Sequence, residues 1–128
     1  MAAAENKELI RKMFAEAPGD ALLNTLADDV KWTIIGTGKY STTYNGKPDL
    51  IARLLGPLGA QIEGHMTIAP FNLIADGEYV AMQSNGKAMS KNGVAYNNTY
   101  CHVFRIVGGK IKEVTEYLDT ELVTRCFG

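Results

Sequence analysis

The sequence predicts an α+β protein in which a curved, mostly antiparallel sheet wraps around helices from the N-terminal half of the chain. Helical apolar patterns come first, between about residues 5 and 58. Candidate strands dominate from Met66 onward, and the hairpin dipeptides Asp76-Gly77 and Asn92-Gly93 separate them. A curved sheet with one open end forms a pocket, so a small-molecule site is expected inside it.

Length and charge limit the possible partners. The chain has 128 residues, which suits a single domain spanning 1–128, and 13 basic against 14 acidic residues give a net charge of -1. No basic cluster indicates nucleic acid or a membrane surface as a partner. The first residues lack the apolar region of a signal peptide, so a cytoplasmic location is expected.

The two cysteines are expected to remain free thiols. Cys101 lies within a strand pattern and Cys126 near the chain end, too far apart in the sequence for a metal-ligand motif. A reducing compartment would also keep them unpaired. No cofactor and no metal ion are therefore expected.

The first two helices follow from apolar spacing. The first begins at about residue 5, with buried positions at Leu9, Ile10, Met13 and Phe14. The segment "APGD" ends it, and Asp20 can cap a second helix. That second helix would bury Leu22, Leu23 and Leu26.

A short strand, a loop and a third helix come next. "VKWTII" places Val30, Trp32 and Ile34 on one strand face, and the following "GTGKYSTTYNGK" has the composition of a long loop. Pro48 suits the first turn of the third helix, which Gly56-Pro57 and Gly59 are expected to break. Its buried stripe would be Leu50, Ile51, Leu54, Leu55 and Leu58.

The last hairpin contains an acid on its buried face. "NNTYCHVFRIVGGKIKEVTEYLDT", residues 97–120, alternates polar and apolar positions on both sides of Gly108-Gly109. Glu116 lies between Val114 and Leu118, where an apolar residue is expected. Burying an unpaired carboxylate costs free energy, so Glu116 is either a structural acid or a general acid or base. Asp119 points away from Glu116 and is expected to cap or anchor the C-terminal segment.

Two registers of this hairpin place different residues opposite Glu116. A three-residue loop at 107–109 pairs Tyr100 with Glu116 and puts Asn98 and His102 on the same face. A two-residue turn on Gly108-Gly109 pairs Tyr100 with Tyr117 instead, which separates Glu116 from the others. The first register is preferred because it brings the polar residues together.

This hairpin, read from Tyr96 to Thr120, resembles the C-terminal hairpin of SnoaL-like proteins in the nuclear transport factor 2-like superfamily. That superfamily includes polyketide cyclases, ketosteroid isomerases and limonene epoxide hydrolases. The upstream segment "LADDVKWTIIGTGKYSTTYNGKPDLIARL" is similar to the early strand, loop and third helix of the same proteins. The resemblance implies a cone-shaped barrel, generally dimeric, with a ligand pocket inside.

The resemblance also implies roles for individual positions. Glu116 takes the place of an aspartate that acts as acid or base in the cyclases and epoxide hydrolases. The Arg-x-Asp pair of the epoxide hydrolases corresponds to Gln83 and Asn85, which carry no charge. Their water-positioning residues fall near Trp32 and Ile34. These replacements argue against epoxide hydrolysis, and the missing second acid of the isomerases argues against steroid isomerisation.

The expected site combines one acid with polar and apolar neighbours. Glu116, Tyr100 and His102 are the candidate catalytic residues. The expected substrate-binding residues are Asn98, Trp32, Gln83, Asn85, Phe104 and Leu118.

Three functions remain open at this point. The first is acid/base catalysis of an isomerase, cyclase or lyase type on a small hydrophobic substrate, with Glu116 as base. The second is binding of a hydrophobic metabolite without catalysis. The third is a dimerisation or partner-binding module with a filled, vestigial pocket. A homodimer through the outer face of the sheet is expected in each case, since Val103 and Tyr117 lie there.

Overall fold

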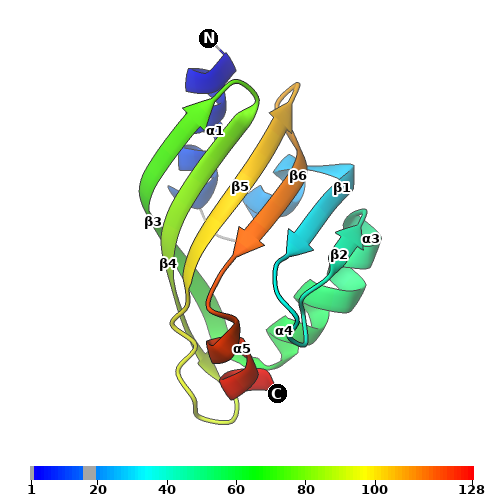
Figure 1. The fold of residues 1–128 in the computed structure, drawn as a ribbon, viewed down its shortest axis with the longest axis vertical. Coiled ribbons are helices and arrows are strands. Elements are labelled where there is room, and N and C mark those ends of the chain that lie inside the picture. Colours follow the sequence, from blue (N-terminus) through cyan, green and yellow to red (C-terminus); the bar gives the residue numbers. More distant parts are fainter. Residues whose placement is uncertain (1, 16–19) are drawn as a thin grey trace.

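The computed structural model describes residues 2–15 and 20–128 and has the α+β architecture that the sequence predicted (Figure 1). The helices are α1 (Ala2–Ala15), α2 (Asp20–Thr25), α3 (Lys47–Leu50), the π-helix η1 (Ile51–Leu55), α4 (Gly56–Ala60) and α5 (Thr120–Phe127). The strands are β1 (Leu26–Ile34), β2 (Thr43–Asn45), β3 (Ile62–Asp76), β4 (Tyr79–Ser90), β5 (Thr99–Val107) and β6 (Lys110–Tyr117). The predicted break at residues 17–19 lies outside the described residues.

The strands form one curved, open sheet of six strands in the order β2-β1-β6-β5-β4-β3. Neighbouring strands are antiparallel except for β1 and β6, which are parallel. The N-terminal helices and α3 to α4 lie behind the sheet in Figure 1, and α5 lies below the ends of β5 and β6. Helices therefore cover one face of the sheet, and α5 covers the end of the sheet where β5 starts and β6 stops.

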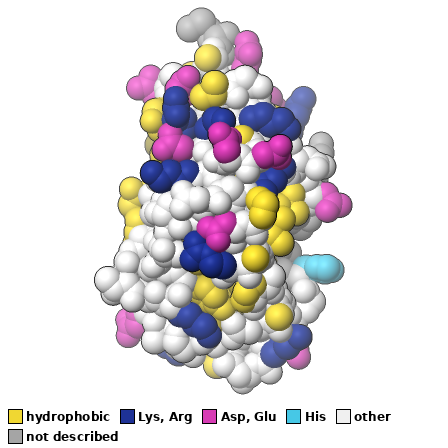
Figure 2. Space-filling model, turned by 90° about the vertical axis from the view of Figure 1, so that its right-hand side faces the viewer, with side chains coloured by type: hydrophobic (Ala, Val, Ile, Leu, Met, Phe, Trp, Pro, Cys, Tyr) yellow, Lys and Arg dark blue, Asp and Glu magenta, His cyan; other side chains and the backbone are white. Residues whose placement is uncertain are grey.

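Strand alternation decides which side chains face the helices. On β1, Val30, Trp32 and Ile34 are buried as predicted, and on β4 the even-numbered residues from Val80 onward are buried. The inward residues join the buried positions of α1, Ile10 and Met13, in one apolar core. The outward positions carry mixed charges, and Figure 2 shows side chains of both signs interspersed on one face of the molecule.

The predicted register of the β5–β6 hairpin is wrong. Both central glycines have positive φ, 59° at Gly108 and 76° at Gly109, so the hairpin closes in a two-residue turn. A β-bulge follows, because Ile106 pairs with Ile111 while Arg105 pairs with Glu113. This shift places Glu116 opposite His102 rather than Tyr100, a result that neither proposed register anticipated. Glu116 nevertheless lies on the same, inward face of the sheet as Tyr100 and His102.

The third helix does not break at Gly56-Pro57, contrary to the prediction. α3, η1 and α4 follow one another without a gap from Lys47 to Ala60. The N–H of Gly56 donates to the carbonyl of Ile51, five residues earlier, and Pro57 lies in the first turn of α4. Proline is tolerated there because the first turn of a helix does not need its missing N–H. Leu50 and Leu54 are buried as expected, whereas Ile51 is exposed.

Two strand predictions also need correction. The segment expected to be one long loop contains β2, which pairs with β1 through Tyr44 and Trp32. From residue 62 onward the chain forms two long strands joined at Asp76-Gly77, whereas three short strands were predicted. The expected third strand around Ala95 contributes only an isolated bridge to Met89. The segment between the turn at Asn92-Gly93 and the start of β5 at Thr99 forms no regular strand.

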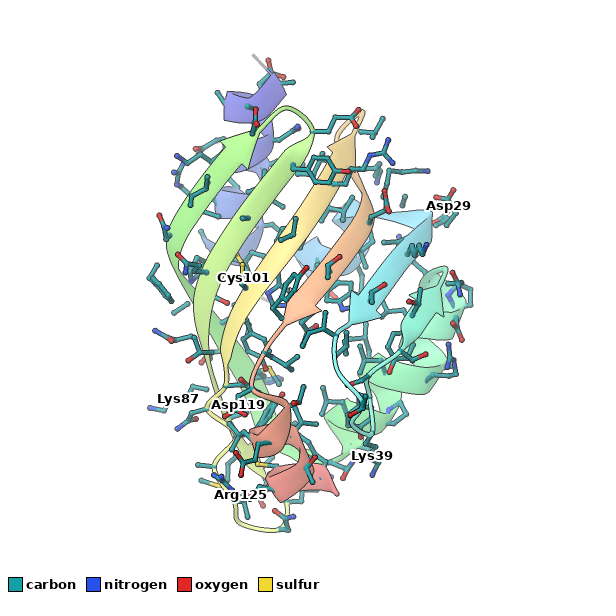
Figure 3. The ribbon with its side chains drawn as sticks, viewed as in Figure 1. Asp29, Lys39, Lys87, Cys101, Asp119 and Arg125 are labelled. Carbon is teal, nitrogen blue, oxygen red and sulfur yellow. The ribbon has the colours of Figure 1, made fainter. Side chains whose placement is uncertain are left out.

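Asp119 caps α5, as the sequence predicted, and stands at the start of that helix in Figure 3. Its carboxylate accepts hydrogen bonds from the backbone N–H groups of Glu121 and Leu122. We expect Asp119→Ala to lower the free energy of unfolding by about 1 kcal/mol, because these N–H groups lose their acceptor. Urea unfolding measures this loss. Asp119→Asn keeps a capping oxygen and should cost less than half as much; equal losses in the two variants would contradict the capping role.

Both cysteines are free thiols in the structure. Cys101 is half-buried on β5, and its position within the sheet is visible in Figure 3. Cys126 is buried in α5, where burial raises the pKa of its thiol. Among the helices of residues 2–15 and 20–128, none combines the length and the apolar character needed to span a bilayer.

Candidate active site

A cavity of about 360 Å³ lies between the sheet and the helices. Its walls come from β1, β3, β5, β6 and the helical segment η1 to α4, with contributions from α5 and the loop before β2. Most lining side chains are apolar, among them Trp32, Ile34, Leu54, Leu55, Leu58 and Ile68. This volume is at the lower end of the range of small-molecule sites. The lining residues include no lysine and no arginine.

Among residues 2–15 and 20–128, Glu116 is the only carboxylate on the cavity wall, and it is 8% exposed. The indole Nε1 of Trp32 donates a hydrogen bond of 3.0 Å to Oε1 of Glu116. The parallel pairing of β1 with β6 makes this contact possible, because Trp32 pairs with Val114 and Ile34 with Glu116. Among the described residues, the contacts to this carboxylate involve Oε1, and no hydrogen bond reaches Oε2. Oε2 is therefore the oxygen available to a ligand.

His102 is the cross-strand partner of Glu116 and also lines the cavity. Its Nε2 lies 3.5 Å from Oε1 of Glu116. The imidazole is stacked against Phe104, with ring centroids 5.8 Å apart and planes 13° apart, and Trp32 meets it edge-on. These rings fix the orientation of His102, so that one nitrogen faces the carboxylate.

Three tyrosines add hydroxyl groups to the same cavity: Tyr40, Tyr96 and Tyr100. Burial raises the pKa of Tyr100 far above its usual range, and burial also raises the pKa values of Tyr40 and Tyr96. Hydrogen bonds from Gln61 to Tyr40 and from Asn98 to Tyr96 oppose part of that rise. The three phenols therefore stay protonated at neutral pH and can donate to a ligand oxygen.

The raised pKa values predict a loss of stability at alkaline pH. A group whose pKa is raised on folding stabilises the native state fully below its unfolded pKa, roughly 10 for tyrosine, and less above it. We expect the free energy of unfolding to be steady from about pH 8 to pH 9.5 and to fall above pH 10. Urea unfolding across this range measures the fall. Tyr100→Phe should make the decline shallower, and an unchanged slope would contradict the assignment.

The structure brings together some of the predicted site residues and separates others. Trp32, Tyr100, His102, Glu116 and Leu118 line the cavity, as predicted. Phe104 is fully buried behind His102 and supports the imidazole without lining the cavity.

Asn98 has a structural position rather than the predicted place on the cavity wall. Its amide donates to the hydroxyl of Tyr96 and to the carbonyl of Asp119, and its oxygen accepts from the N–H of Asp119. It therefore joins the start of β5 to the start of α5.

The predicted pocket positions of Gln83 and Asn85 are wrong. Both side chains are exposed on the outer face of β4, where Gln83 accepts a hydrogen bond from Asn72 and Asn85 accepts one from Thr99. Their inward neighbours on the strand are Met82 and Ser84. A strand alternates faces at each residue, so assigning a position one residue away moves a side chain to the opposite face.

Several cavity residues were not identified from the sequence. Tyr40 and Tyr96 lie in segments without regular strand alternation, so no periodic signal showed which way they point. His65 lies on β3, exposed to solvent, and also contributes to the cavity wall. Among the described residues, no group of three or more His, Cys, Asp or Glu is placed to hold a metal ion.

Comparison with known proteins gives one family and one fold. A SnoaL-like domain model matches residues 7–114. No curated protein sequence matches the chain.

Solved structures share the fold over nearly the whole chain. A nuclear transport factor 2-like protein from Burkholderia xenovorans is 25% identical, with a TM-score of 0.79 and coverage of 100% of this chain and 99% of that one. A SnoaL-like polyketide cyclase from Jannaschia is 14% identical, with a TM-score of 0.78 and coverage of 98% and 92%. TerC, co-crystallized with polyporic acid, is 21% identical, with a TM-score of 0.78 and coverage of 94% and 96%.

Proposed function

This chain belongs to the SnoaL-like domain family, and from that premise we propose that it is an acid/base enzyme acting on a small, mostly apolar substrate. One observation carries the proposal. Glu116 is a buried carboxylate on the wall of an apolar cavity, with two N–H groups near one oxygen and the second oxygen unbonded among the described residues. A carboxylate that served only to stabilise the fold would have no need of a cavity beside it.

The two carboxylate oxygens take different roles in this proposal. Trp32 donates its hydrogen bond to Oε1, and Nε2 of His102 lies 3.5 Å from the same oxygen, so these two rings orient the carboxylate. Oε2 then faces the substrate and removes a proton from a carbon next to a carbonyl group. The electron pair of the broken C–H bond moves to the carbonyl oxygen, which forms an enolate.

The tyrosine hydroxyls would stabilise that enolate. The Tyr100 hydroxyl lies 3.8 Å from the sulfur of Met66, a weak hydrogen-bond acceptor, and also interacts with the hydroxyl of Tyr96, so a substrate oxygen would take the place of these contacts. Where the enolate is conjugated with a C=C bond, Glu116 returns the proton to the far carbon of this dienolate, giving isomerisation. In the other course the α-carbon attacks a carbonyl carbon of the same molecule, the π pair of that C=O bond moves to its oxygen, and Glu116 protonates the resulting alkoxide, giving cyclisation. Either outcome returns the enzyme to its starting protonation state.

The substrate is a neutral molecule in this proposal. Within the described part of the chain, the lining residues offer one carboxylate and no lysine or arginine, so an anionic ligand would meet repulsion without a compensating cation. The predominantly apolar wall favours an alicyclic or aromatic ketone.

Epoxide hydrolysis is disfavoured on position as well as chemistry. Gln83 and Asn85, which the resemblance assigned to the charged pair of the epoxide hydrolases, lie on the outer face of the sheet, and their inward neighbours Met82 and Ser84 carry no charge either. The third function considered above, a module with a filled pocket, is disfavoured by the cavity of about 360 Å³.

Deuterium exchange tests the proposed chemistry without knowledge of the natural substrate. A panel of cyclohexenones, tetralones and cyclic 1,3-diketones is incubated with the protein in D2O, and mass spectrometry follows deuterium uptake next to the carbonyl. We expect at least one ketone to exchange faster with protein than with buffer alone. Saturable binding of panel members without faster exchange would instead establish the alternative function, a binder without catalysis.

We also propose a homodimer formed through the outer face of the sheet. A row of outward side chains crosses four strands, Ile74, Ala81, Val103 and Thr115, and Tyr117 is 47% exposed beside it. Because the chain mass is 13.9 kDa, light scattering at micromolar concentration should give about twice that value. Val103→Lys should give the monomer mass, since it places a charge in the row. The control Glu121→Lys on α5 should remain dimeric; a wild-type protein of monomer mass would contradict the proposal.

A further inference from the structure

Among the described residues, two buried side-chain polar atoms have no hydrogen-bond partner: Oγ of Ser84 and Nδ1 of His102. Ser84 is 0% exposed and His102 is 7% exposed. A buried polar atom without a partner costs free energy, so native proteins pair nearly all of them. These two atoms lie on the neighbouring strands β4 and β5, so a single hydrogen bond between them would satisfy both.

The strand register places these residues diagonally on one face. Ser84 of β4 pairs with Tyr100 of β5, and Met82 pairs with His102. Ser84 is therefore two positions along β4 from the residue directly opposite His102. All four side chains point to the buried side of the sheet. Diagonal neighbours of this kind are about 7 Å apart, which long or flat side chains can bridge.

The ring of Tyr100 leans along β4 from its partner Ser84 toward Gly86. A Cβ added to Gly86 would lie only 2.7 Å from Cε2 of Tyr100, so the Tyr100 ring covers Gly86 rather than its own partner Ser84. The ring of His102 follows Tyr100 in the stack, with centroids 5.2 Å apart and planes 31° apart. A lean of the imidazole in the same direction would bring it over Ser84 rather than over its own partner Met82.

We propose that Ser84 is a positioning residue for His102, and that its hydroxyl donates a hydrogen bond to Nδ1. The bond requires only a change of the serine rotamer or one intervening water molecule. Nε2 lies 3.5 Å from a carboxylate oxygen, which favours the tautomer with its proton on Nε2. Nδ1 is then a bare acceptor, and a hydroxyl is the group that can satisfy it.

This bond would fix the catalytic carboxylate indirectly. Ser84 holds the imidazole in one ring orientation and one tautomer, the imidazole N–H holds Oε1 of Glu116, and Oε2 is left facing the cavity. This catalytic consequence rests on the proposed function, whereas the hydrogen bond itself can be tested without any substrate.

Nitrogen NMR of the histidines tests the bond directly. The chain has only 2 histidines, so an untagged, 15N-histidine-labelled protein gives a spectrum that His65→Gln assigns completely. At neutral pH we expect His102 to be protonated at Nε2 and to have a hydrogen-bonded Nδ1. Ser84→Ala should move the Nδ1 resonance toward that of a free pyridine-type nitrogen, and Ser84→Cys, a weaker donor of similar shape, should give an intermediate shift.

Ser90→Ala provides the matched control. Ser90 is also buried on the inward face of β4, but its hydroxyl bonds to the carbonyl of Val94, so its loss should leave the His102 resonances in place. A wild-type proton on Nδ1, or an unchanged Nδ1 resonance in Ser84→Ala, would overturn the proposal. If the alanine variant does not fold, the Cys variant and the wild-type tautomer still decide it. A lack of ketone exchange would refute the proposed function without affecting this result.

Discussion

Glu116→Gln should slow deuterium exchange of an accepted ketone by a factor of about 100 to 10,000, because the amide cannot take the proton from carbon. The glutamine oxygen can still accept the hydrogen bond from Trp32, so the fold and the ligand affinity should change little. Exchange rates by mass spectrometry give the first quantity, and circular dichroism with a thermal melt gives the second. A folded variant that has lost exchange and still binds the ketone locates the base at Glu116.

Glu121→Gln is the control for this change. It removes a carboxylate of the same size from the exposed surface of α5, away from the cavity. Its exchange rate should stay within about twofold of wild type, since surface substitutions have small effects. An exchange rate in Glu116→Gln equal to that of Glu121→Gln would leave Glu116 with only a structural role.

Phe104→Ala should lower the free energy of unfolding by about 3 to 5 kcal/mol, the largest stability effect we predict for a single substitution. Phe104 is 0% exposed and pairs with Val80 on one side and Val114 on the other. Its ring also contacts Phe14 of α1, with centroids 6.3 Å apart, and stacks on His102. The substitution removes these contacts and leaves a cavity where sheet and helix meet. Urea unfolding measures the loss.

An exposed phenylalanine provides the comparison. Phe71 on β3 is 58% exposed, so Phe71→Ala should change the free energy of unfolding by no more than about 0.5 kcal/mol. If Phe104→Ala does not fold, Phe104→Leu keeps most of the volume and should cost about 1 kcal/mol. Similar losses for the variants at positions 104 and 71 would contradict the central place of Phe104 in the core.

The site was only partly predictable from the sequence. The alternation of side chains depends on one strand alone, whereas the register depends on how that strand pairs with its neighbours. Alternation alone placed Glu116 on the inward face with Val114, and both are buried. The partner of Glu116 depended on the β-bulge between the pairs Ile106–Ile111 and Arg105–Glu113, and no residue type in the turn indicates that bulge. His102 rather than Tyr100 therefore faces the carboxylate.

The contact from Trp32 to Glu116 shows the same limit over a longer distance. These residues are 84 positions apart, on strands that come together only when β1 inserts beside β6 in parallel. No pattern within either strand identifies the other as its neighbour. Sequence alternation could show only that both side chains point inward.

The sequence by itself determined the class of the fold, the inward position of Glu116 and the cap at Asp119. These features depend on the periodicity of single elements and on hydrogen bonds between near neighbours. The tertiary structure decided which inward residues meet, including the carboxylate with the indole and the imidazole. It also decided that Gln83 and Asn85 face outward and that Tyr96 faces the cavity. Those outcomes depend on register, bulges and strand order, which are set by packing across the whole sheet and not by any one segment.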